Sequence, residues 1–162
     1  MALAFIAPGQ GAQFVGMGME LAKSYPQSRS VFEEGDDALG EKLSDLIWYG
    51  SIEDLTLTEN AQPALMATTL AVFRALQSEG LKLSDAKFVA GHSLGEYSAL
   101  AMAESLSISD AAKLLRIRGR AMQNAVPVGV GAMAAILGLS YSDLIEITKQ
   151  AASNGVCQAA ND

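Results

Sequence analysis

The residue best suited to nucleophilic chemistry is Ser93, at the centre of a G-x-S-x-G pattern over residues 91–95. Residues 87–91 predict a strand and residues 94–104 predict a helix. Between a strand and a helix, such a serine occupies a strained turn and projects its oxygen at the helix N-terminus, where backbone N–H groups favour an oxyanion. The first expected oxyanion donor is the N–H of Leu94. The alternative is a glycine-rich turn in which the serine only caps the helix.

A second glycine-rich segment, PGQGAQ at residues 8–13, follows an apolar run at residues 2–7 that predicts a buried strand. It is a poor phosphate-binding loop. A nucleotide-binding fingerprint would need glycine where Phe14 stands, and a phosphate loop would end in Gly-Lys-Ser or Gly-Lys-Thr. A glycine-rich loop after one sheet strand can instead lend a backbone N–H to a site on another strand. Gln10 is therefore the candidate second oxyanion donor.

Arg118 is the third residue of interest, within a predicted helix over residues 109–125. A spacing of four, three and four residues places it on one stripe with three apolar residues, Ala111, Leu115 and Met122. The stripe should face the core, yet no acidic residue lies three or four positions from Arg118. A buried guanidinium needs a partner, either a carboxylate elsewhere in the fold or a ligand. The other basic residues of this helix are expected to be solvated: Lys113, Arg116 and Arg120.

Three strings together carry a family resemblance: PGQGAQ at residues 8–13, GHSLGEYSAL at residues 91–100 and RGRAMQ at residues 118–123. The sequence closely resembles the malonyl-CoA:acyl-carrier-protein transacylases of fatty acid synthesis. It is also similar to the acyltransferase domains of polyketide synthases. The resemblance runs along all 162 residues but covers only about half of the family's chain.

The resemblance implies a ping-pong transfer, in which Ser93 attacks the malonyl thioester and passes the acyl group to the phosphopantetheine thiol of acyl carrier protein. It implies an oxyanion role for Gln10 and a bidentate clamp on the malonyl carboxylate for Arg118. The candidate substrate-binding residues are Arg118, His92, Met122 and Gln62. The expected partners are malonyl-CoA and acyl carrier protein, with no cofactor and no metal.

A serine nucleophile also needs a base within hydrogen-bond reach. The one histidine, His92, is badly placed to take a proton from Ser93 on the same sharp turn. The resemblance implies that the catalytic histidine lies beyond Asp162, so activity is expected only together with a C-terminal half. Two alternatives stay open: a serine esterase or lipase, and a non-catalytic fragment or binding module that keeps the turn as architecture. An inward Arg118 favours an acid-bearing acyl group over a lipid ester.

Further elements are expected around these residues. The pattern predicts helices over residues 16–25, 28–39, 42–49, 62–79 and 142–152, and strands over residues 132–137 and 156–160. Pro63 is expected in the first turn of its helix, and the expected caps are Ser51, Ser107 and Gly40. The fold class is α/β. The resemblance implies an α/β-hydrolase-like large subdomain with a parallel sheet at residues 1–126, and the truncated start of a small ferredoxin-like subdomain at residues 127–162.

Composition excludes several classes of function. Half of the residues are hydrophobic, which allows a sizeable core, and the net charge of −7 argues against nucleic acid as a partner. A single cysteine, Cys157, leaves no internal disulfide and no Cys/His set for structural zinc. No apolar run reaches the length of a membrane span, and no basic region precedes the apolar N-terminus. We therefore expect a cytoplasmic protein that has no membrane as a partner. It is expected to be either a monomer or a chain accompanied by its own C-terminal half.

Overall fold

The computed structural model describes residues 3–127, 129–134 and 136–160. The chain forms two compact units, Met1–Val128 and Gly129–Asp162. All the candidate site residues belong to the first unit, so the elements of that unit position the candidate site.

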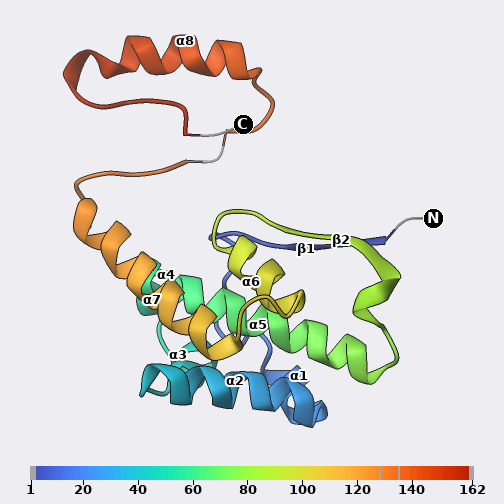
Figure 1. Cartoon of the computed structure of the whole chain (residues 1–162). Coiled ribbons are helices and arrows are strands. Elements are labelled where there is room, and N and C mark those ends of the chain that lie inside the picture. Colours follow the sequence, from blue (N-terminus) through green and yellow to red (C-terminus); the bar gives the residue numbers. More distant parts are fainter. Residues whose placement is uncertain (1–2, 128, 135, 161–162) are drawn as a thin grey trace. The chain divides into compact units, whose positions relative to one another are not determined.

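A two-stranded parallel sheet forms one layer of the first unit (Figure 1). Its strands are β1, Leu3–Ala7, and β2, Ala86–Gly91, and Ala7 lies opposite Gly91. Both predicted strands are confirmed, apart from Ala2, which lies outside the described residues. Because the strands are parallel, the loop after β1 and the turn after β2 leave the sheet at the same edge. These are the two glycine-rich segments singled out by the sequence.

Helices form the rest of this unit and lie on one side of the sheet (Figure 1). They are α1 (Met19–Ser24), α2 (Pro26–Leu39), α3 (Leu43–Tyr49), α4 (Ile52–Thr56), α5 (Thr58–Ser78), α6 (Gly95–Met102) and α7 (Ile108–Ala125). A short 3-10 turn, Leu83–Asp85, leads into β2. The predicted caps are confirmed. Ser51 and Ser107 each accept the backbone N–H three residues on, and Gly40 ends α2 with a φ of 66°.

Helix α5 begins earlier than the sequence predicts. The expected start is Gln62, with Pro63 in the first turn, but α5 starts at Thr58 and Pro63 lies inside it. A proline inside a helix donates no backbone hydrogen bond, so the carbonyl of Glu59, four residues earlier, loses its helical donor. That carbonyl instead accepts a hydrogen bond from the Arg116 side chain at 2.8 Å. A contact from a distant helix thus allows α5 to extend upstream of its proline.

Helix α5 is also the centre of the core, where it packs against α2, α6 and α7. The largest fully buried apolar side chains are Phe32, Ile47, Leu55, Met66, Leu94 and Leu115. Each such side chain contributes roughly 1.5–3 kcal/mol on burial. The rings of Phe5 and Phe73 meet edge to face with 5.3 Å between their centroids, which joins the sheet to α5.

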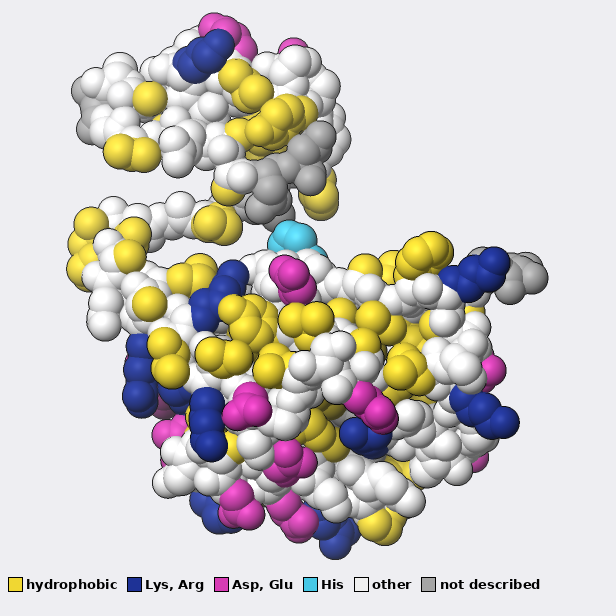
Figure 2. All heavy atoms as spheres, in the orientation of Figure 1, with side chains coloured by type: hydrophobic (Ala, Val, Ile, Leu, Met, Phe, Trp, Pro, Cys, Tyr) yellow, Lys and Arg dark blue, Asp and Glu magenta, His cyan; other side chains and the backbone are white. Residues whose placement is uncertain are grey.

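Another apolar face of α5 is only partly covered within this unit. Helical spacing places Leu65, Thr69, Val72 and Leu76 on this face. Leu65 is buried, but Val72 is 40% exposed and Leu76 is 45% exposed. Together with Ile6 and Phe14 they line a groove of about 480 Å³ beside β1. Figure 2 shows hydrophobic side chains gathered on this unit near the sheet, with charged side chains mainly over the helices farther from it.

The second unit contains helix α8, Tyr141–Ala151, followed by a short 3-10 turn, Ala152–Asn154. Ser140 caps α8 by accepting the N–H of Asp143. The helix predicted at residues 142–152 is therefore confirmed. In the part of the chain that the structure describes, no helix is long and apolar enough to cross a membrane.

The predictions of strands over residues 132–137 and 156–160 are wrong. Residues 132–134, 136–137 and 156–160 adopt no regular structure, and residue 135 lies outside the described residues. A strand is held by a ladder of hydrogen bonds to a neighbour, and apolar periodicity supplies no neighbour. Among residues 129–134 and 136–160 no strand is formed that could pair with either segment.

Candidate active site

Ser93 lies in the turn between β2 and α6, and its backbone has a φ of 55°. A positive φ is unfavourable for a residue with a β-carbon, and such strain gathers at functional sites. Two hydrogen bonds close the turn: the N–H of Gly95 donates to the His92 carbonyl at 2.9 Å, and that of Glu96 to the Ser93 carbonyl at 3.2 Å. The Ser93 side chain is left exposed at the start of α6. The N-cap of α6 is Leu94, without a side-chain cap, so Ser93 does not serve as the cap.

Both glycines of the G-x-S-x-G pattern are required by close backbone contacts. A β-carbon on Gly91 would lie 1.9 Å from the carbonyl carbon of Gly95. A β-carbon on Gly95 would lie 2.5 Å from the carbonyl oxygen of Ala7. The obstructing atoms belong to the backbone and cannot rotate away as a side chain can. The glycines therefore allow the turn that carries Ser93 to close against the end of β1.

The loop after β1 lies directly against this turn. The N–H of His92 donates to the Ala7 carbonyl at 3.1 Å, and a β-carbon on Gly9 would lie 2.4 Å from His92 Nδ1. Within the same loop, the Gln10 side chain donates from Nε2 to Thr58 Oγ1 at 3.3 Å. Among the described residues, the backbone N–H groups of Gln10 and Leu94 have no acceptor. The two candidate oxyanion donors thus belong to neighbouring segments at one edge of the sheet.

Arg118 reaches Ser93 from helix α7. Its Nη2 donates to Ser93 Oγ at 3.0 Å, and its Nη1 donates to Gln62 Oε1 at 2.6 Å. Gln62 is fully buried, and its own Nε2 donates to Met122 Sδ at 3.3 Å. The structure therefore joins Ser93 to three of the candidate substrate-binding residues through a chain of hydrogen bonds.

The surroundings of Arg118 bear on its predicted carboxylate partner. The side chain is half-buried, less so than the stripe predicts, because Met122 at the end of that stripe is exposed. Within residues 3–127, 129–134 and 136–160, Arg118 forms no ion pair with Asp or Glu. A guanidinium beside an exposed hydroxyl and without an acidic partner in those residues is well suited to bind an anionic group.

His92 stands next to Ser93 but has another environment. Its side chain is exposed, and its Nδ1 faces the backbone of Gly9. The side chain that contacts Ser93 Oγ in the described residues is Arg118, which is a donor. This geometry places an exposed hydroxyl beside a positive charge, and among the described residues no proton-accepting side chain contacts Ser93 Oγ.

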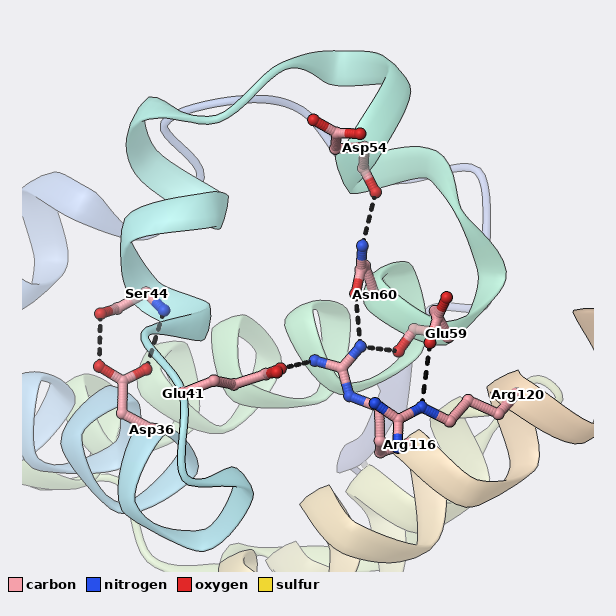
Figure 3. Close-up of polar contacts among 8 residues, drawn as sticks. All are labelled: Asp36, Glu41, Ser44, Asp54, Glu59, Asn60, Arg116 and Arg120. Atoms are coloured by element: carbon pink, nitrogen blue, oxygen red, sulfur yellow. Dashed lines mark hydrogen bonds and ion pairs between the residues drawn. The ribbon is translucent and has the colours of Figure 1, made fainter.

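The prediction that Arg116 is solvated is wrong. Arg116 is only 6% exposed. Its guanidinium donates to the Glu59 carbonyl at 2.8 Å, to Asn60 Oδ1 and to the Glu41 carboxylate (Figure 3). Burial lowers the pKa of the Arg116 guanidinium below its ordinary value, and the nearby charge of Arg120 lowers it further. A buried cation with several fixed acceptors is a structural feature that the helical stripe did not reveal.

A signal for this burial is present in the sequence. Ala112, Arg116 and Gly119 share one stripe of α7, and small residues beside an arginine let another helix approach closely. The other two basic residues behave as predicted. Lys113 is exposed, and Arg120 is largely exposed and pairs with Glu59 at 3.0 Å.

Comparison with known proteins shows similarity along almost the whole chain. The sequence model of the acyl transferase domain matches residues 4–161. A malonyl CoA-acyl carrier protein transacylase of Bacillus subtilis (strain 168) is 49% identical over 160 residues, which are 98% of this chain and 50% of the relative. The transacylase of Escherichia coli (strain K12) is 44% identical over 158 residues, again 98% of this chain and 50% of the relative.

Solved structures agree with these relatives. An acyl-carrier-protein-S-malonyltransferase from Bartonella henselae is 56% identical, with a TM-score of 0.93 over 100% of this chain and 52% of that protein. A malonyl-transacylase in complex with a type II PKS acyl-carrier protein is 40% identical, with a TM-score of 0.86 over 94% of this chain and 49% of that protein. This chain spans about half the length of the curated relatives that it matches.

Proposed function

We propose that this chain, which belongs to the acyl transferase domain family, carries the nucleophile and the carboxylate-binding residue of a malonyl-CoA:acyl-carrier-protein transacylase. The observation that carries the proposal is the contact between Arg118 Nη2 and Ser93 Oγ at 3.0 Å. A guanidinium at that distance suits an acyl group with a carboxylate two carbon–carbon bonds from the carbon under attack, as in malonyl. The names of the relatives support the same acyl group.

In the proposed first half-reaction, Ser93 Oγ attacks the thioester carbonyl carbon of malonyl-CoA. The new oxygen–carbon bond forms, the carbon–sulfur bond breaks, and a base carries the serine proton to the departing thiolate. The N–H groups of Leu94 and Gln10 stabilise the negative charge on the carbonyl oxygen. Arg118 binds the malonyl carboxylate, and Gln62 orients Arg118 through the 2.6 Å hydrogen bond.

In the second half-reaction, the phosphopantetheine thiol of acyl carrier protein attacks the malonyl-serine ester. The base takes the thiol proton, the ester carbon–oxygen bond breaks, and Ser93 Oγ is protonated again. His92 is not assigned as this base, because it belongs to the turn of the nucleophile and faces Gly9. The relatives are about twice as long as this chain, and we assign the base to the half that this chain does not cover.

The proposed partners are malonyl-CoA and acyl carrier protein. A malonyl-transacylase that resembles this chain forms a complex with an acyl-carrier protein, which supports the second partner. We assign His92 and Met122 to the lining of the acyl site, beside Arg118. The first unit is proposed as part of an α/β-hydrolase-like subdomain, and the second as the start of a ferredoxin-like one. The active protein is proposed to be cytoplasmic, as a monomer or as two pieces.

A serine hydrolase is the second candidate, since the strained Ser93 turn would also suit acyl transfer to water. Incubation of the full-length gene product with malonyl-CoA, followed by intact mass, separates the two. A transacylase is expected to show a stable malonyl adduct that acyl carrier protein discharges, whereas a hydrolase would show a transient one. If no adduct formed at any time, both the transacylase and the hydrolase proposals would be contradicted. Ser93→Ala is the matched negative control, because it lacks the hydroxyl that would carry the adduct.

A further inference from the structure

Pro63 lies inside helix α5 and changes the backbone hydrogen bonding there. Because Pro63 has no N–H, the carbonyl of Glu59 lacks the donor that a helix normally provides four residues later. Arg116 fills that vacancy from α7, with 2.8 Å between Nη1 and the carbonyl oxygen. A guanidinium from one helix therefore completes the hydrogen bonding of another.

Two side chains complete the surroundings of Arg116. Asn60 Oδ1 accepts from the same Nη1, and the Glu41 carboxylate accepts from Nη2 (Figure 3). Asn60 is itself fixed, because its Nδ2 donates to the Asp54 carbonyl at 2.9 Å. The acceptors come from two segments, the first turn of α5 and the loop between α2 and α3, and converge on one planar fork, which suits arginine and not lysine.

The two helices are in close contact where these bonds form. A β-carbon on Gly119 would lie 2.6 Å from the Cα of Glu59 and 2.7 Å from the Thr58 carbonyl oxygen. Backbone therefore faces backbone where α7 crosses the first turn of α5. Arg116 secures that position with its three acceptors.

We propose that Arg116 is a positioning residue, which locks α7 onto the first turns of α5 and thereby holds Arg118 at Ser93. Arg118 follows Arg116 by two residues, and its partner Gln62 follows Glu59 by three. A small slide of α7 along α5 would therefore lengthen the Arg118–Gln62 and Arg118–Ser93 hydrogen bonds together. This inference rests on the proposed function, in which Arg118 binds the malonyl carboxylate.

The test is Arg116→Lys in the full-length gene product, because lysine keeps the charge but cannot span three separated acceptors. The readout is the ratio of kcat/KM for malonyl-CoA to kcat/KM for acetyl-CoA. A displaced Arg118 should lower the malonyl value about tenfold or more, whereas the acetyl value should change by less than about twofold. Loss of the fold alone would lower both values alike.

Two further variants separate positioning from stability. Ser44→Ala removes a buried hydrogen bond to Asp36 that is 2.7 Å long and also visible in Figure 3, but it does not touch α7. It should lower the melting temperature and leave the ratio unchanged. Pro63→Ala restores a backbone N–H that competes with Arg116 for the Glu59 carbonyl. It should lower the ratio without removing any charged group, and it carries the test if Arg116→Lys does not fold.

Arg118→Ala is the reference that keeps the two proposals apart. If Arg118→Ala leaves the malonyl-to-acetyl ratio unchanged, the proposed function of Arg118 is wrong. If Arg118→Ala lowers the ratio but neither Arg116→Lys nor Pro63→Ala does, the positioning role of Arg116 is overturned and the proposed function stands. A lowered ratio in all three variants, with Ser44→Ala unchanged, supports both.

Discussion

Truncation of Arg118 to alanine is the perturbation that bears most directly on the proposed function. It removes the hydrogen bonds to Gln62 at 2.6 Å and to Ser93 at 3.0 Å. In the proposed reaction it also removes the partner of the malonyl carboxylate. Acetyl has no carboxylate, so acetyl transfer gives an internal reference in the same protein.

The size of the effect follows from the burial of Arg118. Removing one partner of a buried charge pair costs about 2–5 kcal/mol. Arg118 is only half-buried, so solvent screens the pair and the lower part of that range, about 2–3 kcal/mol, applies. At about 1.4 kcal/mol per factor of ten, kcat/KM for malonyl-CoA should fall by about 30- to 150-fold.

The assay measures kcat/KM for malonyl-CoA and acetyl-CoA with acyl carrier protein as acceptor. Gln62 is fully buried and would lose its donor, which should lower stability by about 1–3 kcal/mol. Both substrates must therefore be assayed well below the melting temperature of the variant. An equal loss for malonyl and acetyl would refute the reasoning, because Arg118 would then act on the fold or on Ser93 alone.

Three other substitutions test the turn and the caps. Ser93→Ala should abolish malonyl labelling in intact mass without changing the circular dichroism spectrum, and labelling elsewhere would exclude Ser93 as the nucleophile. Gly95→Ala should destabilise the protein by roughly 1–3 kcal/mol or prevent folding, since its β-carbon would meet the Ala7 carbonyl at 2.5 Å, and an unchanged urea midpoint would contradict this. Ser107→Ala should cost about 0.5–2 kcal/mol in the same urea titration, because the Asp110 N–H loses its acceptor; no loss would show that the cap is replaceable.

The parts of the site that the sequence predicts correctly depend on local chemistry. The strained turn at Ser93 follows from two glycines and the strand and helix that flank them, all within a few residues. The caps at Ser51 and Ser107 form for the same reason, since donor and acceptor are three residues apart. The helical period predicts the direction of Arg118 only in part, because the side chain is half-buried and Met122 on the same stripe is exposed.

The failures concern partners that are distant in the chain. Arg116 looked solvated because Glu41 and Asn60, its acceptors, are 75 and 56 residues away. The start of α5 is also predicted too late, because a proline usually lies in the first turn of a helix. The hydrogen bond from Arg116 to the Glu59 carbonyl, which allows α5 to extend upstream of Pro63, comes from a distant part of the chain. Each error is therefore one of tertiary context overriding a local rule.

The lack of a base near Ser93 leads to the final prediction, which concerns residues 1–162 alone. In the residues that the structure describes, the side chain in contact with Ser93 Oγ is Arg118, a donor that cannot take the serine proton. Without a base the hydroxyl is a weak nucleophile. The apolar groove beside β1, with Ile6 77% and Phe14 62% exposed, also favours association of the isolated polypeptide. The isolated 162 residues are therefore expected to transfer malonyl poorly or not at all.

The measurement is transfer from malonyl-CoA to acyl carrier protein by purified residues 1–162, beside the Bacillus subtilis relative, of which this chain covers 50%. Adding the half of that relative that this chain does not match should restore turnover, because the base is assigned to that half. The matched control is the same addition to Ser93→Ala, where any gain must be absent if the nucleophile comes from this chain. A soluble, monodisperse preparation of residues 1–162 with turnover close to that of the relative would contradict the prediction. It would mean that the proton of Ser93 has an acceptor within this chain that the arrangement of the turn does not reveal.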